Sequence, residues 1–418
     1  MKLVKLSLAA IVAAGALTSV ASAASLEEAI KNVDVTGYAR YRFDSKSNTT
    51  GTTGLFGEVK KADSKNTHRF TSDVNFKAAL DDNFFGVVGF RYDSQDVSGE
   101  RVNAKTNVGT SDAGNDDKYG QTFNVRQFYL GYTAGNTTLT AGRQVLGTFF
   151  TDDMVGTGIK VLNSDISGLT LAAIAFDNLQ ADSDIGSAAL LIGPTGTTNE
   201  YVYDRNLYGV AAIGSYDPVS FQVWYAALDS VAQLYALDVT VGANLGDVDL
   251  SLQAQYAGSS LWANNAQYRD PNKGALEVTK LDDAQFAAVE AGVKAYGFDA
   301  NAGYVWFDTD SASLISFEDQ GGFIDAGEDL LNYTAFIGEN KYWFLTAGYT
   351  FDKVRVGADY VAGRIITTNE ATDRYEAVAR VDYKYSKKLN FKAWYSYINE
   401  DNENLDKDHF RFEARYNF

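Results

Sequence analysis

The feature that most constrains this chain is a period-two alternation of apolar and polar residues, which recurs in segments of roughly ten residues along most of its length. The segment 34–44 is an example: Val35, Gly37, Ala39, Tyr41 and Phe43 fall on one face, and Thr36, Tyr38, Arg40, Arg42 and Asp44 fall on the other. Such alternation predicts β-strands with one apolar face and one wet face. Roughly ten residues is also the length that a tilted strand needs to cross a lipid bilayer.

Marking every such segment predicts about eighteen strands. We place them at 33–44, 67–80, 83–94, 122–134, 136–146, 157–164, 168–177, 206–217, 219–230, 233–244, 247–258, 286–296, 298–308, 341–351, 353–364, 374–386, 388–399 and 409–418. The chain is rich in Tyr and Phe, and it has 3 Pro and 37 Gly, which is a strand-and-turn composition. The predicted class is therefore all-β.

The connections between these strands alternate between long and short. Long connections are expected at 45–66, 95–121, 178–205, 259–285 and 309–340, with tight turns such as Asp81–Asp82 and Leu245–Gly246 between them. This rhythm is typical of a transmembrane antiparallel β-barrel, with its turns in the periplasm and its loops outside. The strands must close on each other, because an open sheet edge in lipid would leave backbone amides unpaired. The last strand supports this, since Phe410, Phe412, Ala414, Tyr416 and Phe418 share its outward face.

The N-terminus carries a different signal. Lys2 and Lys5 precede an apolar run from Leu6 to Leu17, and small residues close it at Ala21–Ala23. This pattern predicts a cleaved signal peptide at 1–23, followed by a barrel domain at 24–418 in the outer membrane of a Gram-negative cell. Without Lys2 and Lys5, 34 basic and 54 acidic residues remain, which gives a net charge of −20. Such a chain repels nucleic acid and attracts cations.

Cysteine is absent, which excludes disulfides, thiolate metal sites and a cysteine nucleophile. The fold must therefore be stabilised by backbone pairing and closure.

Several segments resemble the Campylobacter-type major outer membrane porin family. They are LEEAIKNVDVTGYARYRFD at 26–44, FNVRQFYLGYT at 123–133, TDDMVGTGIKVLNSDISGLTLAAIAFD at 151–177, NLYGVAAIGSYD at 206–217 and YEAVARVDYKYSKKLNF at 375–391. The resemblance spans nearly the whole mature chain and is weakest in the long outer loops, apart from EDQG at 318–321. It implies an eighteen-stranded barrel, a homotrimer, and passive diffusion of small hydrophilic solutes with a preference for cations. The chain departs from the family after Asp153, where it has fewer residues.

The stretch Gly142–Gly158 interrupts the strands where the third outer connection is expected. We predict that it folds into the lumen and narrows it, with Asp152 and Asp153 as its charges. Inward positions on the wall carry Arg40, Arg42, Arg69, Lys77 and Arg91, which would put a positive strip opposite a negative loop. Asp44, Asp73 and Asp93 would line the wall or its outer rim, and Glu318 and Asp319 complete the candidate constriction. Each of these residues can equally be a solvated lumen residue.

Two further arginines are candidates for the constriction. Strict alternation after Leu139 and Ala141 would place Arg143 on the lipid face, which is costly at mid-bilayer. We therefore expect the strand to end at Gly142, so that Arg143 can reach the lumen. Arg126 has no clear position from the sequence.

The sequence calls for no required cofactor. Carboxylates around a pore could nevertheless hold Ca²⁺, and Asp152, Asp153 and Glu318 are the candidate ligands. Two other functions remain open. One is a structural or adhesive barrel with a blocked lumen; the other is a hydrolase that uses an Asp–His pair, drawn from His68 or His409 with Asp44, Asp406 or Asp408.

Overall fold

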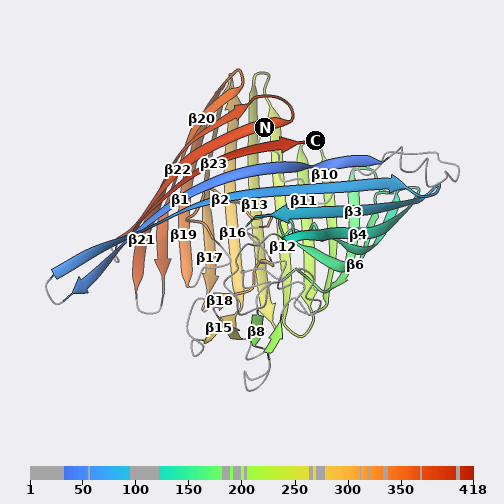
Figure 1. Cartoon of the computed structure of the whole chain (residues 1–418), viewed down its shortest axis with the longest axis horizontal. Helices are drawn as coiled ribbons and strands as arrows, with labels where there is room; N and C mark the ends of the chain where they lie inside the picture. The colour runs from blue at the N-terminus through green and yellow to red at the C-terminus, as the bar shows by residue number, and fades with distance from the viewer. Residues whose placement is uncertain are drawn as a thin grey trace.

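A computed structural model describes residues 33–54, 57–94, 122–180, 189–191, 199–201, 205–262, 267–269, 278–310, 312–317, 321–332, 338–367, 370–401 and 405–418. These residues form an 18-stranded antiparallel sheet that closes into a barrel, together with a separate 5-stranded sheet (Figure 1). The predicted all-β class and the predicted number of barrel strands are confirmed. The predicted signal peptide at 1–23 lies outside the described residues.

The barrel strands match the predicted segments one by one, with ends that differ by a few residues except at the connection between the first two strands, where each strand extends ten residues further than predicted. They are β1 (Asp34–Gly54), β2 (Gly57–Ala79), β3 (Phe84–Asp93), β4 (Thr122–Ala134), β5 (Thr137–Val145), β6 (Val155–Asn163), β7 (Leu169–Asp177), β10 (Leu207–Tyr216), β11 (Val219–Leu228), β12 (Ala232–Asn244), β13 (Val248–Leu261), β16 (Ala284–Ala295), β17 (Phe298–Thr309), β19 (Glu339–Phe351), β20 (Val354–Ile366), β21 (Ala371–Lys384), β22 (Leu389–Glu400) and β23 (Leu405–Asn417).

The first and last of these strands close the barrel. β1 pairs with β2 on one side and with β23 on the other, and both ladders are antiparallel. The ends are joined directly, because the backbone amide of Gly37 donates to the carbonyl of Phe418 at 3.2 Å and the amide of Phe418 donates back at 3.1 Å. The described start and the end of the chain therefore lie together at the end of the barrel that carries the short turns.

The short strands belong to the opposite end of the barrel. They are β8 (Ala189–Leu191), β9 (Asn199–Tyr201), β14 (Gln267–Arg269), β15 (Val278–Asp282) and β18 (Ala312–Ser313), and they pair in the order β18-β15-β14-β8-β9. Figure 1 shows them beyond the ends of the long barrel strands. Three of the long connections thus contribute to one small sheet at the loop end.

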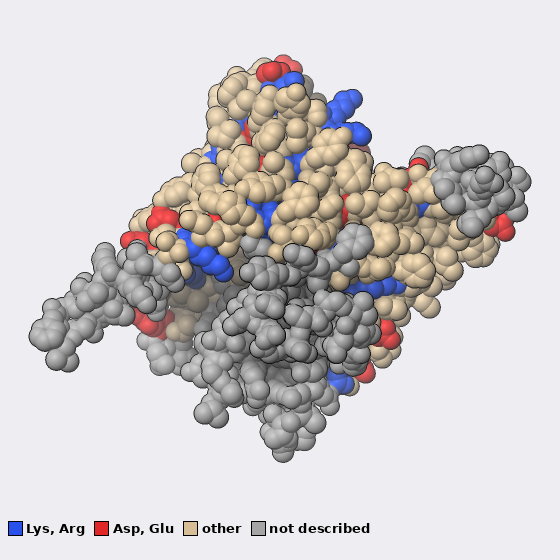
Figure 2. Space-filling model, viewed as in Figure 1, with Lys and Arg blue, Asp and Glu red and all other residues tan. Residues whose placement is uncertain are grey.

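The two faces of the barrel differ as the alternation predicts. On β4, Val125, Phe128 and Leu130 are exposed on the outer face, with 53%, 66% and 57% of their surface accessible. The part of the outer wall seen in Figure 2 is mostly uncharged, as expected for a surface that faces lipid. Among the described residues, no helix is long and apolar enough to cross a membrane.

The prediction of a long loop at 45–66 is wrong. β1 and β2 continue their ladder from Asp34↔Lys77 as far as Gly54↔Gly57, so this connection is an extended hairpin. Figure 1 shows it reaching past the rim of the barrel. The sequence of 45–66 shows only weak alternation, because it consists largely of Ser, Thr, Asn, Lys and Gly, and this is why the sequence predicts a loop there.

The expected end of a strand at Gly142 is also wrong. β5 runs through Gly142 to Val145, and Gly142 pairs with Tyr129 of β4 and Gly158 of β6. Gly142 has a φ of 131°, and a Cβ placed on it would lie 2.4 Å from the carbonyl oxygen of Phe128. Glycine is therefore required here by close backbone approach within a continuous strand.

This contact predicts that Gly142→Ala lowers the free energy of unfolding, by an amount on the order of 1–3 kcal/mol. The added methyl group would press on backbone atoms, which cannot move without breaking the ladder. Urea titration of the protein in detergent micelles, followed by tryptophan fluorescence, measures the change.

Gly242→Ala is the matched control for that variant. Gly242 also lies in a barrel strand, but a Cβ there would meet nothing closer than the carbonyl oxygen of Leu250 at 3.9 Å. This variant should change the free energy of unfolding by less than roughly 1 kcal/mol. Equal effects of the two substitutions would contradict the role given to Gly142.

Candidate functional site

Five predicted lumen arginines come together on one sector of the barrel wall. Arg40 and Arg42 lie on β1, Arg69 on β2, Arg91 on β3 and Arg126 on β4, and these four strands are consecutive neighbours in the sheet. Since side chains alternate across a strand, the arginines of β1–β3 share the face opposite to the exposed Tyr41 and Phe70. These five arginines therefore lie on a continuous patch of wall.

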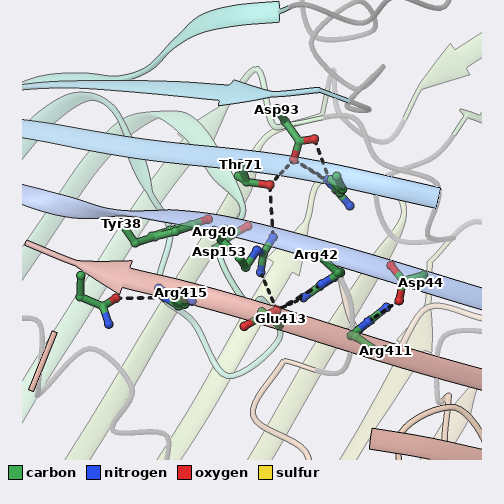
Figure 3. Close-up of polar contacts among 12 residues, drawn as sticks. Tyr38, Arg40, Arg42, Asp44, Thr71, Asp93, Asp153, Arg411, Glu413 and Arg415 are labelled. Carbon is green, nitrogen blue, oxygen red and sulfur yellow. Dashed lines mark hydrogen bonds and ion pairs between the residues drawn. The ribbon is translucent and has the colours of Figure 1, made fainter. Parts of the chain in front are cut away.

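Carboxylates neutralise much of this patch. Arg42 donates to Oε2 of Glu413 through Nε at 3.2 Å and through Nη2 at 2.9 Å. Arg69 pairs with Asp93 at 2.7 Å, and Asp93 also accepts a hydrogen bond from Thr71 at 2.9 Å. Figure 3 shows Arg42 with Glu413, and Thr71 with Asp93, on neighbouring strands. The wall is thus a network of alternating charges.

Asp153 reaches this network from the connection between β5 and β6. Its carboxylate pairs with Nη2 of Arg91 at 2.5 Å and with Nη2 of Arg126 at 2.8 Å. Both arginines also face Asp73, at 3.3 Å and 3.7 Å. The neighbouring Asp152 is exposed. Of the two acidic residues predicted for the constriction, Asp153 is therefore paired with the arginines of the wall, and Asp152 is open to solvent.

A β-bulge explains the position of Arg126. In the ladder between β3 and β4, Gly89 pairs with Gln127 and Phe90 pairs with Val125, so Arg126 is the extra residue. Val125 and Phe128 are both exposed on the outer face, so Arg126 and Gln127 both point inward. A bulge is a known means of redirecting one side chain. The sequence shows the same break, since the apolar phase shifts between Val125 and Phe128.

Among the described residues, Arg143 makes no ion pair with this cluster. It pairs in register with Phe128, which is 66% exposed on the outer face, and its Nη1 donates to the carbonyl of Asn178 at 3.2 Å. The expectation that Arg143 reaches the lumen rested on a strand end at Gly142, which the continuous β5 contradicts.

The described residues give no support to the Ca²⁺ site. Asp153 is already held by two arginines, so its oxygens are not free ligands. Glu318 and Asp319 lie outside the described residues. Among the side chains that the structure describes, no group of three His, Cys, Asp or Glu could hold a metal ion.

The segment that carries Asp153 rests on an apolar cluster. Leu146, Phe149, Phe150 and Met154 are all at most 1% exposed. Phe149 and Phe323 lie 4.8 Å apart between ring centroids, and Phe150 lies 6.1 Å from Phe317. The backbone amide of Phe317 donates to the carbonyl of Phe150 at 2.8 Å, which ties the two segments together. Residues 146–154 are therefore packed against residues 314–317 and 321–331.

The cluster also contains side chains of the barrel wall, which come from the inner face of the strands. Its wall side chains come from strands β6 to β22 and are at most 8% exposed: Leu162, Ala172, Ile174, Phe176, Trp224, Ala226, Leu228, Leu234, Ala236, Ala257, Phe286, Ala288, Val305, Phe307, Tyr342, Phe344, Val361 and Ile398 are among them. On β19, for example, Tyr342 and Phe344 are buried, whereas Trp343 between them is 49% exposed. The arginine patch and the apolar cluster thus occupy different sectors of the barrel.

A buried carboxylate holds the second segment. Glu376 of β21 has 0% exposure and accepts backbone hydrogen bonds from Glu328 at 3.0 Å, Asp329 at 3.0 Å and Leu330 at 3.1 Å. The hydroxyl of Ser396 donates a further bond to it at 2.5 Å. A buried carboxylate is costly unless its oxygens are hydrogen-bonded, and here the loop backbone supplies the donors.

Two more wall residues reinforce this attachment. Gln255 of β13 donates to the carbonyl of Gly322 at 2.9 Å and accepts from the amide of Ile324 at 2.7 Å. Arg380 pairs with Glu328 at 2.8 Å. Burial raises the pKa of the Glu328 carboxyl, although nearby Lys392 and Arg380 act in the opposite direction. Residues 321–332 are therefore attached to two separate parts of the wall, at β13 and at β21.

The histidines show no catalytic arrangement. His409 is 4% exposed, and its two ring nitrogens contact Asp329 at 2.7 Å and Asp44 at 2.8 Å. His68 lies on the outer face, where the hydroxyl of Tyr41 is 2.8 Å from its Nδ1. The predicted pairing of His409 with Asp44 exists, but both nitrogens are occupied by carboxylates, so the ring has no free position for a reacting group.

Sequence reasoning missed the role of residues 314–317 and 321–331, and that of Glu376. A signal was present, because Leu314, Ile315, Phe317, Phe323 and Ile324 are too apolar for a solvated loop. The apolar inner face was also visible in Phe221–Leu228, FQVWYAAL, where neither face is polar over most of its length. Glu376 has no such signal, since it occupies an ordinary inward position.

The attachment predicts that Glu376→Gln loosens residues 321–332. The amide has one acceptor oxygen where the carboxylate has two, so some loop amides lose their partner at a cost of about 1–3 kcal/mol each. Hydrogen exchange measured by mass spectrometry should show faster exchange at 328–330, while the barrel strands stay protected. Glu413→Gln is the control, since Glu413 binds arginine side chains and holds no loop backbone; faster exchange at 328–330 in that variant would contradict the assignment.

The comparisons with known proteins agree with this architecture. Three solved structures share the fold, although low identity limits the inference to the fold itself. Pseudomonas aeruginosa OpdQ has a TM-score of 0.64 and 13% identity, covering 92% of this chain and 98% of that one. A BenF-like porin from Pseudomonas fluorescens Pf-5 gives the same values. Acinetobacter baumannii OccAB4 has a TM-score of 0.63 and 12% identity, covering 91% and 98%.

Among curated protein sequences, none matches this chain. A family profile does match it: the profile of the Campylobacter major outer membrane protein covers residues 1–418. The resemblance seen in the strand and turn segments is thereby confirmed over the full length. The chain belongs to the Campylobacter major outer membrane protein family, the porins of the outer membrane, which are not enzymes.

Proposed function

We propose that this protein is a general diffusion porin, a water-filled homotrimeric channel that passes ions and small hydrophilic solutes and prefers cations. The observation that carries the proposal is the pairing of Asp153 with Arg91 and Arg126, which brings a charged loop against a charged wall within a closed barrel. A polar wall and an electric field are all that permeation requires.

Residues 146–154 are the proposed constriction. They form the third outer connection, and their apolar side chains pack on the cluster while Asp153 crosses to the arginine patch. Residues 321–332 support them through the bonds to Phe149 and Phe150. In this proposal, the inward-folded loop 146–154 acts together with residues 314–317 and 321–332, whose contacts with Phe149 and Phe150 support its position.

The cation preference follows from the balance of charges. The chain has 54 acidic and 36 basic residues, and Asp152 is exposed beside the paired Asp153. Most arginines of the patch are matched by Asp73, Asp93, Asp153 and Glu413, which limits their attraction for anions. The free acidic groups therefore dominate the field that a mobile ion meets.

The outer surface suits a protein that is surrounded by outer-membrane lipid. Tyr41, Tyr395, Tyr383, Tyr385 and Tyr416 are all exposed, as aromatic girdles near the two ends of the strands require. The mature chain is proposed to begin at Ala24, which the intact mass of the protein isolated from membranes would show.

Planar-bilayer recording tests the proposed function. Purified protein should produce stepwise conductance in KCl, and voltage should close each inserted unit in three equal steps, one for each subunit. Absence of any channel would favour the alternative of a structural or adhesive barrel, in which the apolar cluster and the inserted segments block the lumen. A single closing step for each unit would contradict the proposed trimer but would still support the proposed channel.

Reversal potentials in a KCl gradient test the origin of the cation preference. Asp152→Asn and Asp153→Asn each remove one negative charge, and a unit charge acts at 10 Å in water with about 0.4 kcal/mol. Each should lower the cation-to-anion permeability ratio by about twofold. The effect should be larger for Asp153→Asn, because that change also releases Arg91 and Arg126.

Asp352→Asn provides the matched control for both variants. Asp352 lies in a short turn at the opposite end of the barrel, with a φ of 52° that asparagine also tolerates. It changes the net charge by the same amount, so it should leave the reversal potential unchanged. A shift equal to that of the loop variants would mean that overall charge, and not the loop, sets the selectivity.

A further inference from the structure

Two arginines face each other across the seam that closes the barrel. Arg40 of β1 and Arg415 of β23 are paired in register, and both lie on the lumen face of their strands. Like charges directly opposite each other in a sheet are destabilising. Two arginines in this arrangement are retained only where other interactions offset their repulsion, and positions that break a local rule in this way are often functional.

The partners available to Arg40 are weak. Its Nη1 lies 4.0 Å from Glu413, and Glu413 is already held by two shorter bonds from Arg42. Its Nη2 is 3.5 Å from the hydroxyl of Thr71, and its Nε is buried without a hydrogen-bond partner among the described residues. Arg40 therefore retains donors that the surrounding wall does not satisfy.

Arg415 has no ion pair with any carboxylate in the part of the chain that the structure describes. Its Nε donates to the neutral amide oxygen of Asn417 at 3.0 Å, and its guanidinium carbon lies 3.9 Å from the centroid of the Tyr38 ring. The guanidinium carbon of Arg40 lies 5.6 Å from the same ring. Figure 3 shows Tyr38 beside both arginines.

Tyr38 adds a further donor to this group. Its hydroxyl oxygen accepts a hydrogen bond from Nη2 of Arg91 at 3.1 Å. A phenol that accepts one bond can still donate its own proton. Around one tyrosine ring, the wall thus presents a phenol proton and two guanidinium groups, whose planar forks match the geometry of a carboxylate.

We propose that Arg40, Arg415 and Tyr38 form a binding site in the channel for the carboxylate group of a small organic solute. The carboxylate lies between the two guanidinium groups and accepts bonds from them and from the phenol. The site rests on the proposed function, because a solute reaches it only through an open lumen. It gives a channel that prefers cations a defined stopping point for organic acids.

Glucuronate and glucose are a matched pair of probes, since they share a ring and differ by a carboxylate in place of a hydroxymethyl group. The uptake of the two labelled sugars into proteoliposomes containing the purified protein should depend differently on sugar concentration. Glucuronate uptake should saturate with concentration and be inhibited by gluconate, whereas glucose uptake should rise linearly. Sorbitol, the uncharged counterpart of gluconate, should not inhibit.

Arg40→Gln and Arg415→Gln should each raise the half-saturation concentration for glucuronate on the order of tenfold, as expected for the loss of a charge-assisted hydrogen bond. Glucose uptake should not change. Arg355→Gln is the control: Arg355 is also a wall arginine, but it is paired with Asp299 through bonds of 3.0 and 2.5 Å. It changes the lumen charge equally and should leave glucuronate saturation as in the wild type.

Each outcome is decisive for one of the two proposals. Linear glucuronate uptake in the wild type overturns the carboxylate site, and so does an effect of Arg355→Gln equal to that of Arg40→Gln or Arg415→Gln. Neither result contradicts the proposed porin function. Absence of glucose uptake overturns the general porin, while saturable glucuronate uptake would still support the site. If one arginine variant does not fold, as judged by circular dichroism, the other decides.

Discussion

Closure of the backbone ladder is the constraint on which the rest of this protein depends. In lipid, each backbone amide and carbonyl needs a partner from the protein itself, and only a closed sheet supplies one for every strand. The β1–β23 ladder provides this closure, from Tyr38↔Asn417 to Thr49↔Asp406. Closure also fixes which side chains face the interior, because alternation leaves no freedom once the register is set.

The interior is divided between two kinds of packing. One sector is an apolar cluster in which Phe149, Phe150, Phe317 and Phe323 stack edge to face with each other and with wall residues. The other is the charged network around Arg91 and Asp153. Burial of apolar surface holds residues 146–154 on one side, and ion pairs hold their acidic end on the other. Their position is therefore determined twice, by independent forces.

The sequence was sufficient for the barrel because its signal is repeated in every strand. A single weak segment does not mislead when seventeen others keep the same phase. The same rule failed where a local feature breaks the phase. At Arg126 one extra residue inverts the alternation, and at Gly142 a glycine continues a strand that its sequence suggested was ending.

The site was only partly predictable for a different reason. The arginines of β1–β3 follow from alternation, but their pairing partners come from strands distant in sequence, as Glu413 does for Arg42. The contacts of residues 314–317 and 321–331 depend on three-dimensional packing, and no periodic pattern in the sequence predicts them. Glu376 binds backbone amides, and nothing in the sequence of 328–330 reveals that interaction.

The off-centre apolar cluster has a consequence for how such barrels diversify. The number of strands fixes the circumference, whereas the open cross-section is what remains after the inserted segments have filled their sector. Two barrels of equal circumference can therefore differ widely in electrical resistance through changes confined to a few loop residues. This separates the evolution of the wall from that of the aperture, and it is consistent with a barrel fold that is kept at 13% sequence identity.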